Sequence, residues 1–421
     1  MAAVNGLVAV TIGSMVANLC SYLVHLPASR WLGPGSYGEF AALLQLSLVF
    51  AVPSLALQNV VARQVVRGDD PAGLRRLGLR VAAGSAVLAA AATPVAAATL
   101  HTSVAAAAAA LVSAPALVLL AAEQGLLQGA RRFRRLATVL ALSGLAKVAP
   151  TVPVLALGGG AGGALAAMAV GAAVSAGAAR VLAGGTHAGG HAAVPGRAGA
   201  PDRAGARSVL QASGIQLVLV GFTSVDLLLA RPVLGAAAAG TYALGAVVTK
   251  AAFWLPQAVG VVFYPRLASP AASRRALESV LVILGSLTVV CAAGAAVCAP
   301  LATALAGHAY APVQRWLWLF AVDGGALATL QGVLLYAIAA HRARISGVAW
   351  CGLIVEVIAL AALVHTVGGM ITVAAACAVA TTLIAVAAAL VPVDRCHDRT
   401  QRTRTPCNRT QRRRTQRRRT R

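Results

Sequence analysis

Five ionisable side chains lie inside long apolar stretches of this sequence, where a charge has no water to solvate it. Two are cations, Lys147 and Lys250, and three are acids, Asp226, Asp323 and Glu356. On insertion scales a charge at the centre of a membrane helix costs about 2.5–3.5 kcal/mol, so such residues usually pair with one another or line a wet cavity. Two kinds of chemistry follow: lysines that contact an anionic group, and carboxylates that carry a coupling proton or cation.

Each of these residues also has a purely structural interpretation. An internal ion pair with an acid, for example Asp226 or Glu356, would explain either lysine without any ligand. For Asp226 the sequence favours a structural pair with Arg231, five residues further on and near a helix end, over contact with a substrate. Asp323 and Glu356 stay candidates for ion coupling or for structural pairs.

The stretches that hold these charges have the length of membrane spans. Of the 421 residues, 59% are hydrophobic and 11% are charged, whereas a soluble domain carries about 25% charged residues. A bilayer core about 30 Å thick needs about 20 apolar residues, and inside lipid the backbone must satisfy its own hydrogen bonds. We therefore expect an all-α polytopic membrane protein of about twelve transmembrane helices. The expected spans are 4–27, 40–62, 78–99, 104–127, 136–156, 161–181, 208–229, 240–263, 279–299, 315–338, 346–366 and 370–392.

Arginine placement predicts the orientation of these spans. Eighteen arginines lie in the even-numbered loops, whereas the odd-numbered loops hold only Arg30, Arg231 and Arg315. Basic residues are retained on the cytoplasmic side. The sequence therefore predicts cytoplasmic even loops and cytoplasmic N- and C-termini, in a bacterial cytoplasmic (inner) membrane.

The chain divides into two halves that resemble each other. A Gly/Ala/Pro-rich cytoplasmic linker (182–207) separates a first six-helix lobe (1–181) from a second (208–393), and an Arg-rich tail (394–421) is expected to be disordered. Segment 31–40 aligns with 233–242 at an offset of 202, so that Gly33 and Gly38 match Gly235 and Gly240. Halves of six helices share one orientation, which makes this a parallel repeat. Such repeats are typical of transporters whose substrate lies between the lobes.

Several other classes of function find no support in the sequence. The net charge of +24 is inflated by the tail, which holds twelve of the 35 basic residues, so it indicates topology and no nucleic-acid partner. Seven cysteines form no Cys-x-x-Cys pair and lie near no histidine cluster, so neither a metal site nor a disulfide framework is expected. Neither a phosphate-binding loop nor a Ser-His-Asp constellation is present, and we expect no cofactor and no enzyme activity.

Several motifs of the chain resemble those of a known family. The motif Arg30-Trp-Leu-Gly-Pro-Gly-Ser-Tyr-Gly-Glu-Phe40, then Gln58-Asn-Val-Val-Ala-Arg63, is similar to the start of polysaccharide-biosynthesis flippases of the multidrug/oligosaccharidyl-lipid/polysaccharide exporter superfamily. Gln128-Gly-Ala-Arg-Arg-Phe133 resembles the loop after that family's fourth helix. Asp226-Leu-Leu-Leu-Ala-Arg231 and Tyr264-Pro-Arg-Leu-Ala268 resemble the beginning of its second lobe. The resemblance covers most of residues 25–270.

The resemblance implies two lobes around a central cavity that opens alternately to each face. It implies a flippase for isoprenoid-linked oligosaccharide in cell-surface polysaccharide biosynthesis, with membrane lipids, a polysaccharide polymerase and glycosyltransferases as candidate partners. A lipid pyrophosphate headgroup needs cations on its path. We therefore predict substrate contact for Lys250 and Lys147, with Arg30, Arg231 and Arg315 at the outer rim.

Two alternatives stay open. A drug or cation antiporter of the same superfamily would favour acids over lysines in the first lobe, and the first six expected spans hold Lys147 but only one acid, Glu123. A membrane scaffold of cell-envelope assembly that transports nothing is the other. A membrane glycosyltransferase is disfavoured because the outer loops are short and nearly uncharged.

Overall fold

The protein is described here from a computed structural model. The structure describes residues 2–184, 214, 216–254, 273–339 and 342–391. Every regular element in this part of the chain is helical, so the predicted fold class is confirmed. Most of the predicted linker and all of the predicted tail lie outside the described residues.

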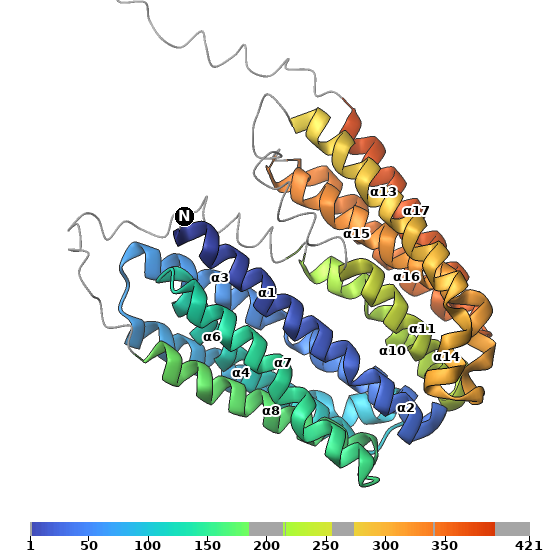
Figure 1. The fold of residues 1–421 in the computed structure, drawn as a ribbon, viewed down its shortest axis with the longest axis horizontal. Coiled ribbons are helices and arrows are strands. Elements are labelled where there is room, and N and C mark those ends of the chain that lie inside the picture. Colours follow the sequence, from blue (N-terminus) through green and yellow to red (C-terminus); the bar gives the residue numbers. More distant parts are fainter. Residues whose placement is uncertain (1, 185–213, 215, 255–272, 340–341, 392–421) are drawn as a thin grey trace, which may run out of the picture.

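Two bundles follow one another along the chain (Figure 1). The first contains α1 (Ala2–Leu23), α2 (His25–Phe50), α3 (Val52–Arg67), α4 (Pro71–Thr99), α5 (Val104–Leu111), α6 (Ser113–Gly129), α7 (Phe133–Ala156) and α8 (Gly160–Ala183). The second contains α10 (Val225–Leu234), α11 (Ala236–Trp254), α13 (Ser273–Val297), α14 (Ala299–Ala306), the 3₁₀ helix η1 (His308–Trp316), α15 (Leu317–Ala339), α16 (Ala343–Leu363) and α17 (Val367–Leu390).

Eleven segments of the described residues are long and apolar enough to cross a membrane. The first, Val8–Arg67, is 60 residues long, about 90 Å of helix at 1.5 Å per residue. That length suffices for two crossings of a core about 30 Å thick. The chain is therefore a multi-pass membrane protein, and the number of crossings in the described residues agrees with the expected count of about twelve.

Small residues let the helices of the first bundle approach one another closely. Gly13 of α1 lies against the backbone of Ala137 in α7, and Gly144 of α7 lies against the backbone of Ala17 in α1. A Cβ at Gly171 of α8 would overlap the backbone of α7. Without a hydrophobic driving force between helices in lipid, this close backbone packing is a main source of helix association. It gives these three glycines a structural role.

The predicted repeat has a matching backbone feature in each half. Gly33 has φ 69° and ψ 169°, and Gly235, 202 positions later, has φ 83° and ψ 172°. Glycine adopts this positive φ without the steric cost of a Cβ, and in both places it separates one span from the next. Later in the halves, α8 and α17 are both 24 residues long and begin 207 positions apart.

The kink at Gly33 corrects one predicted boundary. The second span was expected to begin at residue 40, but helical geometry resumes directly after Gly33. The predicted outer loop is therefore part of α2, and half-buried Glu39 belongs to the span. Hydropathy alone does not reveal where this helix begins. The polar residues before Phe40 interrupt the apolar run, but the helix includes them and starts directly after Gly33.

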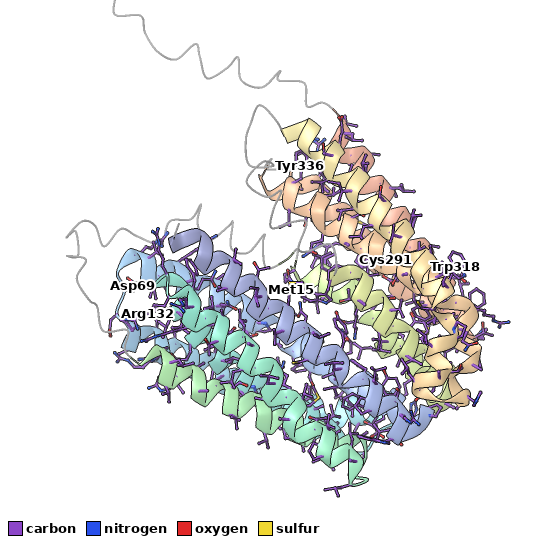
Figure 2. All side chains as sticks on the ribbon, in the orientation of Figure 1. Met15, Asp69, Arg132, Cys291, Trp318 and Tyr336 are labelled. Carbon is purple, nitrogen blue, oxygen red and sulfur yellow. The ribbon has the colours of Figure 1, made fainter. Side chains whose placement is uncertain are left out.

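The two bundles meet at one end and diverge at the other. In Figure 1 the lobes join where α2, α11 and α14 come together, and α2 packs against both of those helices. Figure 2 shows the separated ends, with Asp69 and Arg132 on the first lobe and Tyr336 on the second. Asp69 and Arg132 belong to even-numbered loops. The lobes therefore touch at the odd-loop end, at a surface that we call the seam.

Candidate functional site

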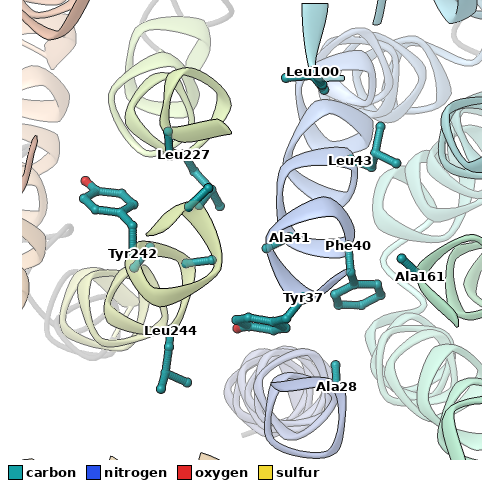
Figure 3. Close-up of a cluster of buried hydrophobic side chains, with 14 of the residues drawn as sticks. Ala28, Tyr37, Phe40, Ala41, Leu43, Leu100, Ala161, Leu227, Tyr242 and Leu244 are labelled. Carbon is teal, nitrogen blue, oxygen red and sulfur yellow. The ribbon is translucent and has the colours of Figure 1, made fainter. Parts of the chain in front are cut away.

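Aromatic side chains fill the seam. Tyr37 and Phe40 of α2 are fully buried. Tyr37 lies on the side of α2 that faces α11, which carries the equally buried Tyr242, whereas Phe40 points the other way, toward Ala161 of α8 (Figure 3). Tyr310 of η1 contacts the Tyr37 ring edge-on at a centroid distance of 6.1 Å, and its hydroxyl donates a hydrogen bond of 2.9 Å to the carbonyl of Ser29. The second lobe is thus fixed to the first by packing and by a buried hydrogen bond.

Two glycines of the repeat meet at the centre of the seam. A Cβ on Gly38 would lie 2.8 Å from the amide nitrogen of Gly240 and 3.0 Å from the carbonyl oxygen of Ala236. A Cβ on Gly240 would overlap the carbonyl of Pro34. The two residues are repeat equivalents, so α2 and α11 cross here about a pseudo-twofold axis. Backbone contact this close is possible only because both positions lack a side chain.

Arg231 of α10 ties the lobes together at the outer edge of the seam. Its guanidinium donates hydrogen bonds of 3.1 Å each to the carbonyls of Gly35 and His101, both in the first lobe. The predicted pair with Asp226 is not formed in the described contacts. Residues five apart on a helix point about 140° away from each other, which explains why the two side chains take different partners.

Lys250 lies deeper along the same seam. Its ammonium donates a 2.5 Å hydrogen bond to Oε1 of Gln45 in the first lobe, and Nε2 of Gln45 donates a 2.5 Å hydrogen bond to the hydroxyl of Ser224. The hydroxyl of Tyr22 donates to the Lys250 carbonyl at 3.1 Å. Gln45 and Ser224 were not predicted from the sequence. The one feature that could have indicated them is an uncharged polar side chain within an apolar stretch.

Three buried carboxyl groups surround Tyr242 in the second lobe. Asp226 accepts hydrogen bonds of 2.7 Å from the Tyr242 hydroxyl and from the backbone amide of Leu227. Asp323 is buried, and the hydroxyl of nearby Thr249 donates a 3.0 Å hydrogen bond to the carbonyl of Phe320. Glu356 is 1% exposed, and its Oε2 atom has no hydrogen-bond partner. Each carboxyl group repels the others electrostatically.

These acids do not form a metal site on their own. Among the described residues, no group of three His, Cys, Asp or Glu side chains is arranged to hold a metal ion. Lys250 attracts Asp226 electrostatically, but the described contacts include no direct ion pair between them. The second lobe therefore holds more buried acid than buried base.

Lys147 occupies α7 in the other lobe. It is half-buried, and its ammonium has no hydrogen-bond or ion-pair partner within the part of the chain that the structure describes. The structure therefore places the two predicted lysines in separate lobes, Lys250 at the seam and Lys147 within the first bundle.

The other two predicted arginines also lie toward the seam end. Arg30 is exposed and follows Ser29, the acceptor of the Tyr310 bond. Arg315 of η1 is exposed and stacks over the ring of Trp316 at 5.2 Å. Arg315 lines a hollow of about 480 Å³ that the start of α17 completes. The structure thus brings the three predicted rim arginines to one end of the molecule.

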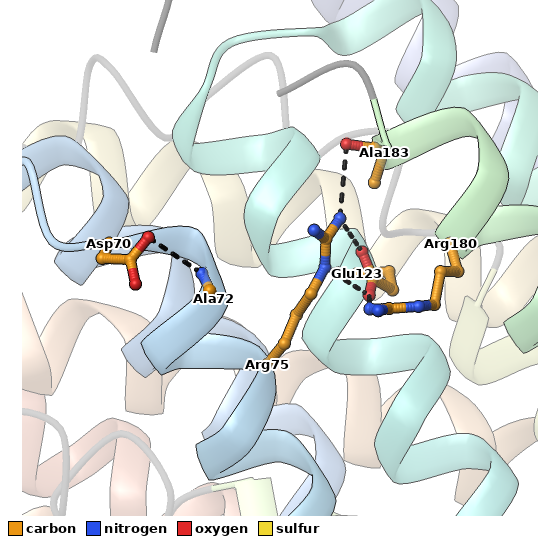
Figure 4. Close-up of polar contacts among 6 residues, drawn as sticks. All are labelled: Asp70, Ala72, Arg75, Glu123, Arg180 and Ala183. Atoms are coloured by element: carbon orange, nitrogen blue, oxygen red, sulfur yellow. Dashed lines mark hydrogen bonds and ion pairs between the residues drawn. The ribbon is translucent and has the colours of Figure 1, made fainter. Parts of the chain in front are cut away.

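An ion-pair cluster holds the first lobe together at the opposite end. Glu123 of α6 accepts two hydrogen bonds from Arg75 of α4, of 2.9 and 3.1 Å, and one of 3.0 Å from Arg180 of α8 (Figure 4). Arg75 also donates to the carbonyl of Ala183. Glu123 is buried while Arg180 is largely exposed. The cluster joins three helix ends of one lobe and gives this acid a structural partner.

Comparisons with known proteins identify the fold. No protein-family model matches the chain, and no curated protein matches it by sequence. Among solved structures, the chain is similar to an inward-facing multidrug resistance MATE transporter of the MOP superfamily, with a TM-score of 0.69, 13% identity and coverage of 91% of this chain and 97% of the other. It is also similar to the lipid II flippase MurJ in an inward closed conformation, with a TM-score of 0.65, 9% identity and coverage of 91% and 88%.

A third similar structure is a MOP superfamily transporter from Pyrococcus furiosus, described by its binding pocket of reverse polarity. Its TM-score is 0.57 at 14% identity, with coverage of 91% of this chain and 94% of the other. At these identities the likeness concerns the fold. The chain has the two-lobed fold found in transporters of the MOP superfamily.

Proposed function

We propose that this protein is a flippase that moves lipid-linked oligosaccharide across the bacterial cytoplasmic membrane by alternating access. The observation that carries the proposal is the position of Lys250. Its ammonium lies at the seam between the lobes, bonded to a neutral amide instead of a carboxylate. A cation held in this way keeps its charge available for an anionic headgroup.

The use of lysine in this chain supports the same conclusion. Lys147 and Lys250 are the only lysines among 35 basic residues, and both lie within apolar spans. All other basic side chains are arginines. A lysine ammonium is a compact charge with three rotatable donors, and it binds phosphate oxygens without imposing the planar geometry of a guanidinium. Two such cations suit a pyrophosphate whose orientation changes during translocation.

The arrangement of the lobes fits loading from the cytoplasmic leaflet. Contacts between the lobes gather at the odd-loop end, and the arginine-rich ends diverge (Figures 1 and 2). With the even loops in the cytoplasm, as the arginine distribution predicts, this is a state closed to the outside. In our proposal the sugar headgroup enters between the lobes while its isoprenoid tail stays in lipid.

The acids of the second lobe supply the driving ion in this proposal. Asp226, Asp323 and Glu356 are buried and mutually repelling, so binding a proton or a monovalent cation relieves their repulsion. Ion coupling therefore belongs to the second lobe, whereas substrate contact involves Lys147 in the first lobe and Lys250 between them. A lipid II flippase is among the proteins of similar fold.

Lipid-linked sugars in a deletion strain test the proposal. We expect an isoprenoid-linked oligosaccharide to accumulate and its surface polymer to disappear, as measured by mass spectrometry of extracted lipids, and the wild-type gene to restore both. Lys250→Arg should retain part of this activity, whereas Lys250→Ala and Lys250→Glu should lose it. Arg76→Ala is the control, because Arg76 is an exposed cation of the arginine-rich end. Full complementation by Lys250→Glu would contradict the headgroup role.

One observation favours a drug or cation antiporter as the second candidate. Glu39 lies within α2 and is half-buried near the seam, so the first lobe does contain an intramembrane acid that a cationic drug would bind. Under this function the deletion strain keeps its normal lipid and glycan profile and becomes sensitive to cationic compounds, and Glu39→Gln reproduces that sensitivity. An unchanged profile with unchanged sensitivity would instead support a non-transporting scaffold.

A further inference from the structure

A chain of buried polar side chains crosses the seam. Gln45 of α2 is 2% exposed and Ser224 is 1% exposed. The Gln45 amide accepts from Lys250 through its oxygen and donates to Ser224 through its nitrogen. One side chain of the first lobe therefore bonds two elements of the second, the last turns of α11 and the residue that precedes α10.

This chain is separate from the contacts that hold the outer edge of the seam. Gln45 lies seven residues beyond Gly38, about 10 Å further along α2, and Lys250 lies ten residues beyond Gly240. Arg231, Tyr310 and the glycine contact join the lobes without involving Gln45. The Gln45 bonds are therefore a second, separate set of contacts between the lobes.

We infer that Gln45 is a positioning residue that releases the seam when an isoprenoid pyrophosphate headgroup binds Lys250. The inference rests on the proposed function and names the group through which the substrate acts on the lobes. A phosphate oxygen is a stronger acceptor for an ammonium than a neutral amide oxygen, because the bond is charge-assisted on both sides. An arriving pyrophosphate thus competes with Oε1 of Gln45 for the Lys250 ammonium.

Once the Gln45 amide has lost Lys250, keeping it buried costs free energy. A buried acceptor that has lost its donor is destabilising, and the structure offers Gln45 no second donor among the described contacts of α11. The cost falls when the lobes separate at this point and water reaches the amide. Substrate binding is thereby linked to opening of the outer side.

The other end of the chain leads to the acids. Ser224 precedes the first residue of α10, two positions before Asp226, and Asp226 is the acid that attracts Lys250. A change in the Gln45–Ser224 bond therefore acts on the helix start that carries this carboxylate. Gln45 connects the cation that receives the headgroup with the carboxylates that receive the driving ion.

Because lysine is rare in this chain, its acetylation allows a direct test on the full-length protein in nanodiscs. A short pulse of acetic anhydride, followed by mass spectrometry, measures acetylation of Lys250 relative to a lysine-containing peptide added to the same sample. Without any ligand, Gln45→Leu should raise Lys250 acetylation relative to wild type because the ammonium loses its acceptor. Gln58→Leu is the matched control, since Gln58 forms a comparable amide bond of 3.0 Å to Gln128 inside the first lobe.

The degree to which geranylgeranyl pyrophosphate protects Lys250 from acetylation then measures headgroup binding. Inorganic pyrophosphate tests the free anion, and geranylgeraniol tests the uncharged lipid. In Gln45→Leu the half-protecting concentration should fall about tenfold, because no amide competes for the charged donor. Translocation in cells should nevertheless fall, since binding no longer releases the seam. Gln45→Glu should raise the half-protecting concentration, because a carboxylate competes more strongly. Gln45→Asn, one methylene shorter, repeats the test if the leucine variant folds poorly.

The outcomes separate the two proposals. Tighter binding together with lost translocation supports the release role, because a merely structural role would weaken both. Equal half-protecting concentrations in wild type and Gln45→Leu would overturn that role while leaving the flippase intact. If the pyrophosphate lipid protects Lys250 in no variant, the proposed function fails and the role of Gln45 fails with it.

Discussion

Replacing Gly240 by alanine should open the outer side of the protein. The added Cβ would overlap the carbonyl of Pro34, a backbone group that cannot rotate away. Overpacking of this kind costs about 1–3 kcal/mol. Alanine also favours the helix over glycine by about 0.5–1 kcal/mol, which strengthens α11 itself. The closed seam is therefore the state that loses stability.

The net cost sets the expected change in population. The helix gain applies to the closed and open states alike, so about 1–3 kcal/mol acts against closure. At about 1.4 kcal/mol per factor of ten, the closed-to-open ratio should fall about five- to 140-fold. Gly38→Ala should act in the same direction, because its Cβ would lie 2.8 Å from the Gly240 nitrogen.

Thiol accessibility from outside the cell measures this shift. Ser29 is fully buried under Tyr310 in the seam, so Ser29→Cys in a variant without the native cysteines reports seam opening to a membrane-impermeant maleimide. Gly177→Ala is the matched control, since Gly177 is a helical glycine whose Cβ would meet nothing within 4 Å. If Gly240→Ala labels no faster than Gly177→Ala, the seam is not the element that closes the outer side.

Much of the fold was predictable from composition, because membrane spans require long apolar runs that a sequence displays directly. The repeat was also visible, since Gly33 and Gly235 occupy backbone conformations that tolerate few other residues. That Gly38 and Gly240 touch each other was not predictable. A repeat gives equivalent positions, but only the docking of the lobes decides which of them lie on the axis.

The charged residues of the candidate site could be predicted from the sequence, but the contacts that they make could not. Lys250 stood out because an intramembrane cation is rare. Its partner Gln45 is 205 residues away and carries no charge, so neither spacing nor charge pattern identified it. Asp226 was expected to pair with nearby Arg231, but Tyr242 on the next helix binds it instead. Local spacing fails here because the partners belong to different helices.

Further substitutions test other parts of this description. Arg231→Lys should loosen the outer seam, because one ammonium cannot reproduce the two guanidinium bonds to Gly35 and His101; the Ser29→Cys assay should show faster labelling, and unchanged labelling would mean that these bonds do not hold the seam. Tyr242→Phe should remove the hydroxyl donor of Asp226 at little cost in packing, so translocation measured against imposed proton and sodium gradients should change its ion dependence; an unaltered dependence would exclude Asp226 from coupling. Glu123→Gln should lower the unfolding temperature of the purified protein, because it leaves the half-buried Arg75 without its bidentate partner, at a cost of about 1–3 kcal/mol. Arg75→Ala should cost more than Arg180→Ala, because the Arg75 side chain is 20% exposed and that of Arg180 is 61% exposed, and ion pairs of exposed groups contribute little. The reverse order would show that the cluster owes its strength to Arg180 and the end of α8, and that burial of the α4–α6 contact is not what holds this end of the lobe together.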